Sequence, residues 1–220
     1  MQARWQFTDR SYGDLAIRSA GDLEQRRRSI VDAPWTWLEQ VHGAAVVVVG
    51  SAGEQAGTRA DAAVTDQPGA PLAVQVADCV PLVLVGTSPS GGAAAVGVVH
   101  AGWRGLGDGI VEATVAALRR LGATGVAAHI GPHIRSRCYE FGAADLDRVV
   151  CAVDPAVRSR TAWGTPALDL TAGLHHVLAA ARVTTADDAG TCTACSPAHY
   201  SHRAQADTGR QAAVAWLEQG

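Results

Sequence analysis

The sequence predicts an α+β protein in which one large β-sheet core is covered by helices. Apolar residues make up 48% of the 220 residues and charged residues only 18%, a balance typical of an ordered globular chain. Short apolar runs of strand length dominate residues 44–100, whereas amphipathic helical patterns become frequent after residue 108. No internal repeat or linker-like stretch divides the sequence, so we expect a single domain over residues 1–220.

The first half of the chain is predicted to consist mainly of strands. Residues 1–21 show no clear periodicity and are expected to be irregular. Asp22 is placed to cap a short helix that runs to about residue 31, before Pro34. Apolar and β-branched runs then predict buried strands at 44–49, 62–65, 72–76, 82–85 and 93–100.

Helical periodicity appears in the second half. The clearest helix is expected over 109–121, where apolar residues form one stripe, Asp108 is placed to cap the start and Gly122 ends it. A strand is expected at 126–130. Further helices are expected over 143–153, from Asp169 or Thr171 to about residue 181, and over about 209–219.

The charge pattern excludes several classes of function. All eighteen basic residues are arginine, so no lysine is present for a Schiff base, a pyridoxal-phosphate site or a phosphate-binding loop. The net charge is −3, and the only basic run, residues 26–28, is expected to be a solvated helix end. We therefore expect no nucleic-acid partner.

Several features indicate a cytoplasmic protein without a membrane partner. The N-terminal residues carry Arg4 and Asp9 where a signal peptide needs an apolar core, and no apolar run approaches the roughly 20 residues of a membrane span. Five cysteines, an odd number, indicate reduced thiols. Cys192 and Cys195 have the spacing of a redox or zinc pair, but no second pair accompanies them and we expect no function there. We expect a monomer.

Three candidate metal ligands stand at predicted strand ends. His42 precedes the strand at 44–49, Cys79 interrupts an apolar run beside Asp78, and His100 ends the strand at 93–100. Taken singly, each histidine could be a hydrogen-bonded structural residue and the cysteine a small buried apolar residue. The carboxylate of Asp78 is harder to explain in an apolar run, since a buried charge needs a partner or a metal.

Together, two histidines and one cysteine suit a catalytic Zn²⁺, because three protein ligands leave the fourth position for water or substrate. The spacings of 37 and 21 residues match no short zinc motif, so a cysteine nucleophile with a histidine base remains an alternative. Metal analysis of purified protein would separate the two. Arginines beside glycine or serine could bind phosphate or lie on the surface, namely Arg104, Arg203 and Arg210.

The sequence resembles the laccase-domain (YfiH-like) proteins, described first as multicopper polyphenol oxidases and later as purine nucleoside phosphorylases. The matching segments are QVHG at 40–43, ADCVPLVL at 77–84, VHAGWRG at 99–105, IGPHI at 130–134, CYE at 138–140 and TGR at 208–210. The resemblance covers the chain from about residue 22 onward. It departs at 201–204, where Ser-His-Arg-Ala stands in place of Ser-Tyr-Arg-Arg, and in a shorter N-terminal segment.

The resemblance implies an α/β/β/α sandwich, with mixed sheets flanked by helices, and a zinc ion on His42, Cys79 and His100. The implied reaction is phosphorolysis of adenosine, inosine, guanosine or methylthioadenosine, with possible deamination of adenosine. Zinc would orient and polarise phosphate or water, and the loop 131–140 would border the nucleoside. Alternatives are a zinc amidase that edits serine-containing peptidoglycan precursors and a copper polyphenol oxidase. The expected catalytic residues are Asp78, Cys79, His100 and Arg104, and the expected substrate-binding residues are Gln40, Arg203 and Arg210.

Overall fold

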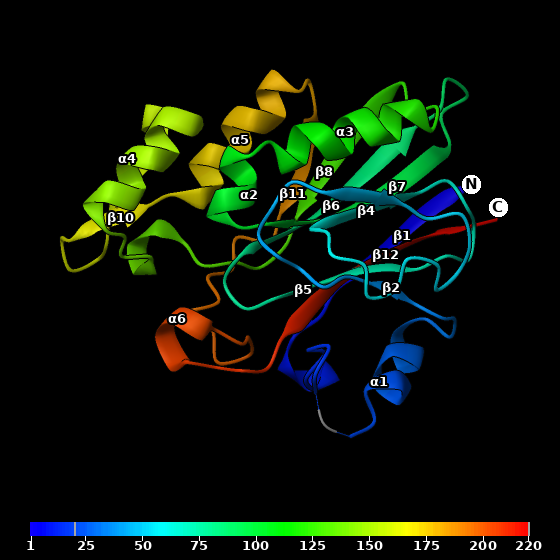
Figure 1. Ribbon diagram of the computed structural model, residues 1–220, viewed down its shortest axis with the longest axis horizontal. Coiled ribbons are helices and arrows are strands. Elements are labelled where there is room, and N and C mark those ends of the chain that lie inside the picture. Colours follow the sequence, from blue (N-terminus) through cyan, green and yellow to red (C-terminus); the bar gives the residue numbers. More distant parts are fainter. Residues whose placement is uncertain (20, 220) are drawn as a thin grey trace.

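Two stacked β-sheets form the centre of the computed structural model, which describes residues 1–19 and 21–219 (Figure 1). One sheet has the strand order β11-β8-β6-β7-β4-β3 and the other β1-β12-β5-β2, while β9 and β10 form a separate pair. The strands are β1 (Gln2–Phe7), β2 (Thr36–Trp37), β3 (Val46–Val48), β4 (Ala62–Thr65), β5 (Leu72–Val76), β6 (Val80–Thr87), β7 (Ala93–Ala101), β8 (Gly125–Ile130), β9 (Arg158–Arg160), β10 (Pro166–Leu168), β11 (Thr184–Asp188) and β12 (Gln211–Glu218).

Helices cover the outer faces of both sheets (Figure 1). The α-helices are α1 (Leu23–Ile30), α2 (Trp103–Gly107), α3 (Ile110–Arg120), α4 (Ala143–Ala152), α5 (Leu170–Ala180) and α6 (His202–Gln205). Helices α2 to α5 share one core with the six-stranded sheet, and α1 packs Leu23 and Ile30 against the four-stranded sheet. This order of helix, sheet, sheet and helix confirms the sandwich that the resemblance implies.

The central strands are apolar on both faces because both faces are buried. On β6, Leu82 and Leu84 pack under the helices, whereas Val83 between them faces the other sheet. On β7, Val98 and Val99 divide in the same way. A strand buried on both sides reads as a continuous apolar run, which explains why β4 to β7 could be recognised in the sequence.

The expectation of a C-terminal helix over 209–219 is wrong, because this segment forms the strand β12. It lies between β1 and β5 and pairs antiparallel with both. Ala213, Ala215 and Leu217 point into the core between the sheets, while Val214 points toward α1. Alanine favours a helix in isolation, but the burial of alternate residues on two faces outweighs that preference here.

The expectation that residues 1–21 are irregular is wrong for Gln2–Phe7, which form β1. β1 pairs with β12 along its whole length. Ala3, Trp5 and Phe7 pack against the core between the sheets, so the segment did carry an alternating signal. Further strands absent from the sequence expectation are β2, β9, β10 and β11.

The helix caps were predicted with mixed success. Asp169 caps α5, with the backbone N–H of Ala172 donating to its carboxylate at 2.9 Å. Asp108 instead ends α2, and Gly109 with φ of 85° precedes α3. The residue between these two consecutive helices has a left-handed backbone conformation, which glycine adopts without steric cost.

The basic run at 26–28 is only partly a solvated helix end. Arg28 is exposed and pairs with Glu24 and Asp32. Arg27 is buried, with its guanidinium 5.4 Å from the ring centre of Trp37. In the described part of the chain, no helix is long and apolar enough to cross a membrane.

Candidate metal centre and its cleft

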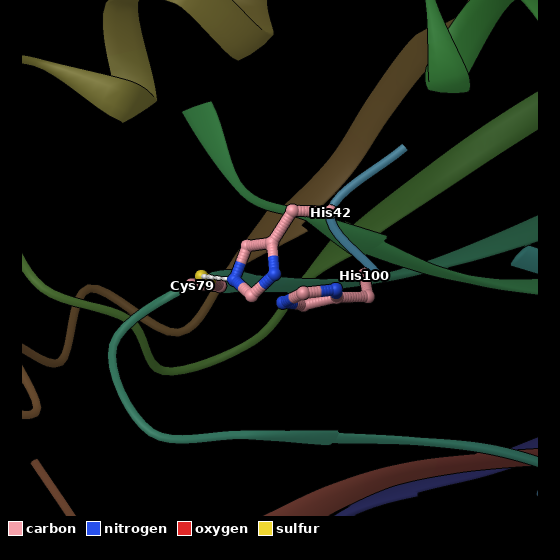
Figure 2. A group of neighbouring side chains, drawn as sticks. All are labelled: His42, Cys79 and His100. Carbon is pink, nitrogen blue, oxygen red and sulfur yellow. Dashed lines mark hydrogen bonds between the residues drawn. The ribbon is translucent and has the colours of Figure 1, made fainter. Parts of the chain in front are cut away.

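Three side chains from distant parts of the chain converge at one place (Figure 2). His42 comes from the loop between β2 and β3, Cys79 from the turn between β5 and β6, and His100 from β7. One ligand atom of each lies within 4.8 Å of the others. The Cys79 Sγ is 3.9 Å from the His42 Nε2, and the two imidazole rings are centred 4.7 Å apart. The structure therefore brings together the three residues expected to bind zinc.

A buried carboxylate that sequence reasoning missed holds this arrangement. Asp61 is fully buried and accepts a 2.8 Å hydrogen bond from the Nδ1 of His100. This bond leaves the Nε2 of His100 as the nitrogen available to a metal. Histidine ligands commonly use their second nitrogen in this way, with a carboxylate fixing the ring and increasing its basicity. The available sequence signal was a lone carboxylate directly before the apolar strand β4.

Asp61 also shapes the backbone that carries His42. His42 has φ of 61°, a left-handed conformation that costs free energy in a residue with a side chain. The backbone N–H groups of Val41, His42 and Gly43 all donate to the Asp61 carboxylate, at 3.2, 2.9 and 2.8 Å. These hydrogen bonds offset the cost, so one carboxylate positions two of the three candidate ligands.

Two glycines in the segment after His100 allow the close approach of α2. A Cβ atom on Gly102 would lie 2.9 Å from the Cδ2 of His42 and 3.3 Å from the Cys79 Sγ. A Cβ atom on Gly105 would lie 2.7 Å from the carbonyl oxygen of Gly43. These distances are too short for side chains, so glycine is required at both positions for α2 to pack beside the ligands.

The charges in the cluster support one another. Burial alone would raise the pKa of the Cys79 thiol, but His100 and His42 lower it to about 6. Burial alone would lower the pKa of His100, but the anions of Cys79 and Asp61 raise it to about 9. At neutral pH the metal-free site therefore holds a thiolate beside an imidazolium. The thiolate is the form of cysteine that binds metals.

Asp78 directs its carboxylate into the protein. The hydroxyls of Thr193 and Ser201 donate to it at 2.7 and 2.8 Å, and the backbone N–H of Arg203 donates at 2.6 Å. Its own backbone has φ of 97°, at the turn that leads into Cys79. Asp78 therefore connects the turn bearing Cys79 to the segment 193–203.

The cluster opens onto a cleft of about 800 Å³, a size typical of small-molecule sites. All the expected site residues contribute to its lining, and Trp103 and Tyr139 supply aromatic surface. Within the loop 131–140, Tyr139 is the residue that reaches the cleft. His133 is instead fully buried and hydrogen-bonds the carbonyl of Gly131 and the hydroxyl of Thr171.

Arg104, which was predicted to be catalytic, and the predicted substrate-binding residues differ in how free their side chains are. The Arg104 guanidinium lies 4.3 Å from the ring centre of Trp103 and forms no ion pair among the described residues. The Arg203 guanidinium lies over Tyr139, 4.7 Å from the ring centre, and donates to the carbonyl of Glu140.

The other two predicted substrate-binding residues are more constrained. Arg210 donates to the backbone carbonyls of Asp207 and Gly209 at 3.1 and 2.8 Å. Gln40 pairs both ends of its side-chain amide with the backbone of Gln75, at 2.8 Å each. Gln40 therefore joins the loop before His42 to β5 and forms part of the wall of the cleft.

The fold and the site together define a member of a known family. Residues 17–218 match the family described as multi-copper polyphenol oxidoreductase laccase, and the chain belongs to that family. This confirms the family that the sequence motifs indicated.

Particular relatives carry a different description. A protein of Streptomyces coelicolor named purine nucleoside phosphorylase is 40% identical over 206 residues, which are 92% of this chain and 83% of the relative. One of Streptomyces griseus with the same description is 39% identical, covering 98% of this chain and 95% of the relative. Among solved structures, YlmD from Geobacillus stearothermophilus has a TM-score of 0.82 at 28% identity and covers 99% of this chain and 92% of that chain.

Proposed function

We propose that this protein is a zinc-dependent purine nucleoside phosphorylase, which transfers the sugar of a purine nucleoside to phosphate. The observation that carries the proposal is the His42–Cys79–His100 cluster in the wall of an arginine-lined cleft. The relatives named purine nucleoside phosphorylase support the same reaction.

The donor atoms fit zinc. Two imidazole nitrogens and one thiolate, with a carboxylate behind one imidazole, are a ligand set that Zn²⁺ accepts, and three protein ligands leave one position open. When bound, zinc would supply Lewis-acid polarisation of an oxygen on phosphate or water.

Copper is the alternative suggested by the family description, since two histidines and a cysteine also bind copper. Oxidation by a multicopper enzyme needs several copper ions with mainly histidine ligands. The second group of candidate ligands in the described part of the chain consists of three cysteines and contains no histidine. This ligand supply favours a single zinc at the first site.

Arg104 is the residue best placed to bind phosphate. Arg104 lines the cleft beside the cluster, and it forms no ion pair with a described carboxylate. Arginine is suited to this role because its planar group donates two parallel hydrogen bonds to phosphate oxygens. Arg203 and Arg210 add positive charge to the same cleft.

The aromatic residues of the cleft would contact the purine. Tyr139 and Trp103 present ring surface at the cleft, and burial raises the pKa of Tyr139, so its phenol is neutral. A neutral phenol combines an apolar face with one hydrogen-bond donor, which suits a heterocyclic base.

Asp78 and Gln40 are assigned positioning roles within this proposal. Three donors face the Asp78 carboxylate, so it fixes the segment that carries Arg203 rather than transferring a proton. Gln40 fixes the loop that carries His42 through its two hydrogen bonds to Gln75.

The proposal is tested with nucleosides, with and without phosphate, on protein of measured zinc content. We expect adenosine, inosine, guanosine or methylthioadenosine to release free base and sugar 1-phosphate only when phosphate is present. Cys79→Ser is expected to lose both the zinc ion of this cluster and turnover, whereas Cys151→Ser, at an exposed cysteine on α4, keeps both. Full phosphate-dependent turnover by Cys79→Ser that has lost the zinc ion of this cluster would contradict the proposal.

The same assay decides between the proposal and its hydrolytic alternatives. Conversion of adenosine to inosine without phosphate would show deamination at this site. Release of serine from a muramyl peptide, without phosphate consumption, would show an amidase instead.

A further inference from the structure

A second group of sulfur atoms lies outside the cleft described above. The sulfurs of Cys138, Cys192 and Cys195 all lie within 4.8 Å of one another. Cys138 belongs to the 3₁₀ turn Ser136–Cys138, and the other two come from the segment after β11. Cys192 and Cys195 were expected to have no function because no second pair accompanies them, but the structure places Cys138 beside them as a third sulfur.

The backbone presents these thiols in a fixed arrangement. The N–H groups of Cys195 and Ser196 donate to the carbonyl of Cys192, at 3.2 and 3.1 Å, which folds the pair into a tight turn. The N–H of Arg135 donates to the Cys192 Sγ at 3.4 Å. The N–H of Thr193 donates to the carbonyl of His133 at 3.1 Å, which ties this turn to the loop bearing Cys138.

The distances between the sulfurs limit what this group can be. The Sγ atoms of Cys138 and Cys195 are 3.1 Å apart, well beyond the roughly 2.05 Å of a disulfide bond. In a tetrahedral zinc site with Zn–S bonds of about 2.3 Å, two sulfurs lie about 3.8 Å apart. Cys195 is exposed, so its side chain has room to move by the roughly 0.7 Å required.

We propose that Cys138, Cys192 and Cys195 form a second metal site, which binds Zn²⁺ through three thiolates with water or another exogenous ligand in the fourth position. Three sulfur donors without a carboxylate favour a thiophilic ion over Mg²⁺ or Ca²⁺. Hydrogen bonds from backbone N–H groups to sulfur, such as that from Arg135, stabilise a bound thiolate.

The position of this site gives it a structural role for the cleft. Tyr139, the residue after Cys138, lines the cleft. Thr193, the residue after Cys192, is fully buried and donates to the carboxylate of Asp78. A metal shared by these cysteines would join the wall that carries Tyr139 to the segment that anchors the turn of Cys79.

The first test is zinc stoichiometry, measured by mass spectrometry on full-length protein purified with a reductant and without chelator. If both metal sites exist, we expect two zinc ions per chain in the wild type and in the matched control Cys151→Ser. Cys195→Ser and Cys138→Ser are expected to lose one ion each and to keep the ion at His42, Cys79 and His100. Cys79→Ser loses the other ion, so failure at one site is distinguished from failure at the other.

Cobalt(II) substitution gives a second readout that is independent of activity. The intensity of the thiolate-to-cobalt charge-transfer absorption increases with the number of bound thiolates. Cys79→Ser should therefore keep about three quarters of the wild-type intensity, and Cys195→Ser about a quarter if the three-cysteine site is lost.

A third readout uses the unmodified chain and so does not depend on the folding of any variant. In the native protein, zinc should protect Cys192 and the exposed Cys195 from alkylation by iodoacetamide, and a chelator should remove that protection. Cys195→Ser protein with the full zinc content of the wild type would overturn the proposal. So would a Cys138–Cys195 disulfide that persists in reductant, or alkylation of Cys192 and Cys195 that is the same with and without the chelator.

Discussion

The two thiol-bearing groups of this protein differ in what surrounds them. The group of His42, Cys79 and His100 mixes nitrogen and sulfur donors, is backed by buried Asp61 and opens onto a large cleft. The group of three cysteines has sulfur donors alone and lies on two surface turns. Both groups supply three protein ligands, but a mixed site that opens onto a cleft suits chemistry on a substrate, whereas an all-sulfur site between two turns suits the joining of two segments. The contrast suggests that one protein uses cysteine for two different purposes.

The largest difference between the two groups is expected when Cys79 is replaced. Cys79→Ser removes the single thiolate of the first site, and we expect kcat/KM for phosphorolysis to fall by at least about a thousandfold, since zinc catalysis supplies several kcal/mol. Cys195→Ser should reduce it far less, because that residue does not line the cleft. Steady-state kinetics on both variants check this, and equal losses would remove the distinction between the sites.

The next effect concerns the carboxylate behind His100. Asp61→Asn should lower the zinc affinity of the first site by about 10- to 100-fold, because the amide cannot accept from all four N–H groups that face Asp61. The zinc affinity of the three-cysteine site should not change. Competition with a chromophoric chelator measures both, with Asp66→Asn as a control in the turn after β4. An unchanged affinity would mean that Asp61 only supports the fold.

A smaller effect is expected at Arg104. Arg104→Ala should raise the KM for phosphate by about tenfold while zinc content stays the same, which corresponds to the lower end of the roughly 1.5–3 kcal/mol contributed by a charged hydrogen bond. Arg120→Ala on the exposed side of α3 serves as the control. If KM for phosphate is the same in both variants, another arginine of the cleft binds the phosphate.

The pH dependence of alkylation should separate the two groups in metal-free protein. Cys79, with its pKa lowered to about 6 by the two histidines, should react as a thiolate above pH 6 and lose reactivity below it. Burial and the two neighbouring cysteines raise the pKa of Cys138 to about 12, so it should stay unreactive through pH 9. Mass spectrometry of peptides alkylated at a series of pH values measures both midpoints. Matching midpoints would contradict the electrostatic account.

The sequence predicted the first site because each of its ligands carries a local signal. His42 precedes an apolar strand, Cys79 interrupts an apolar run and His100 lies at the end of a third, and the glycines after His100 mark a close approach of the backbone. Asp61 could not be recognised in this way, since its importance depends on where β4 and β7 bring it. Its neighbours in the sequence show only a carboxylate before a strand.

The three-cysteine group was missed because it depends on long-range pairing. β11 pairs parallel with β8, so the segments that follow these two strands meet at the same edge of the sheet. Cys138 and Cys195 are 57 residues apart and become neighbours only through that pairing. The polar sequence of β11 gave no strand signal, and without that strand the three cysteines could not be brought together.

The C-terminal segment shows a different limit. Local composition favours a helix over 209–219, but the chain folds there as β12 between β1 and β5. β12 could be recognised only together with β1, whose alternation of Ala3, Trp5 and Phe7 was also overlooked. Preferences of single segments therefore predict the central strands well and the long-range partners poorly.

The most direct test of the central claim is anomalous X-ray diffraction from crystals of the native protein at the zinc absorption edge. The account predicts a strong anomalous peak within bonding distance of the His42, Cys79 and His100 side chains. A crystal grown with zinc that shows no peak among these three residues would contradict it.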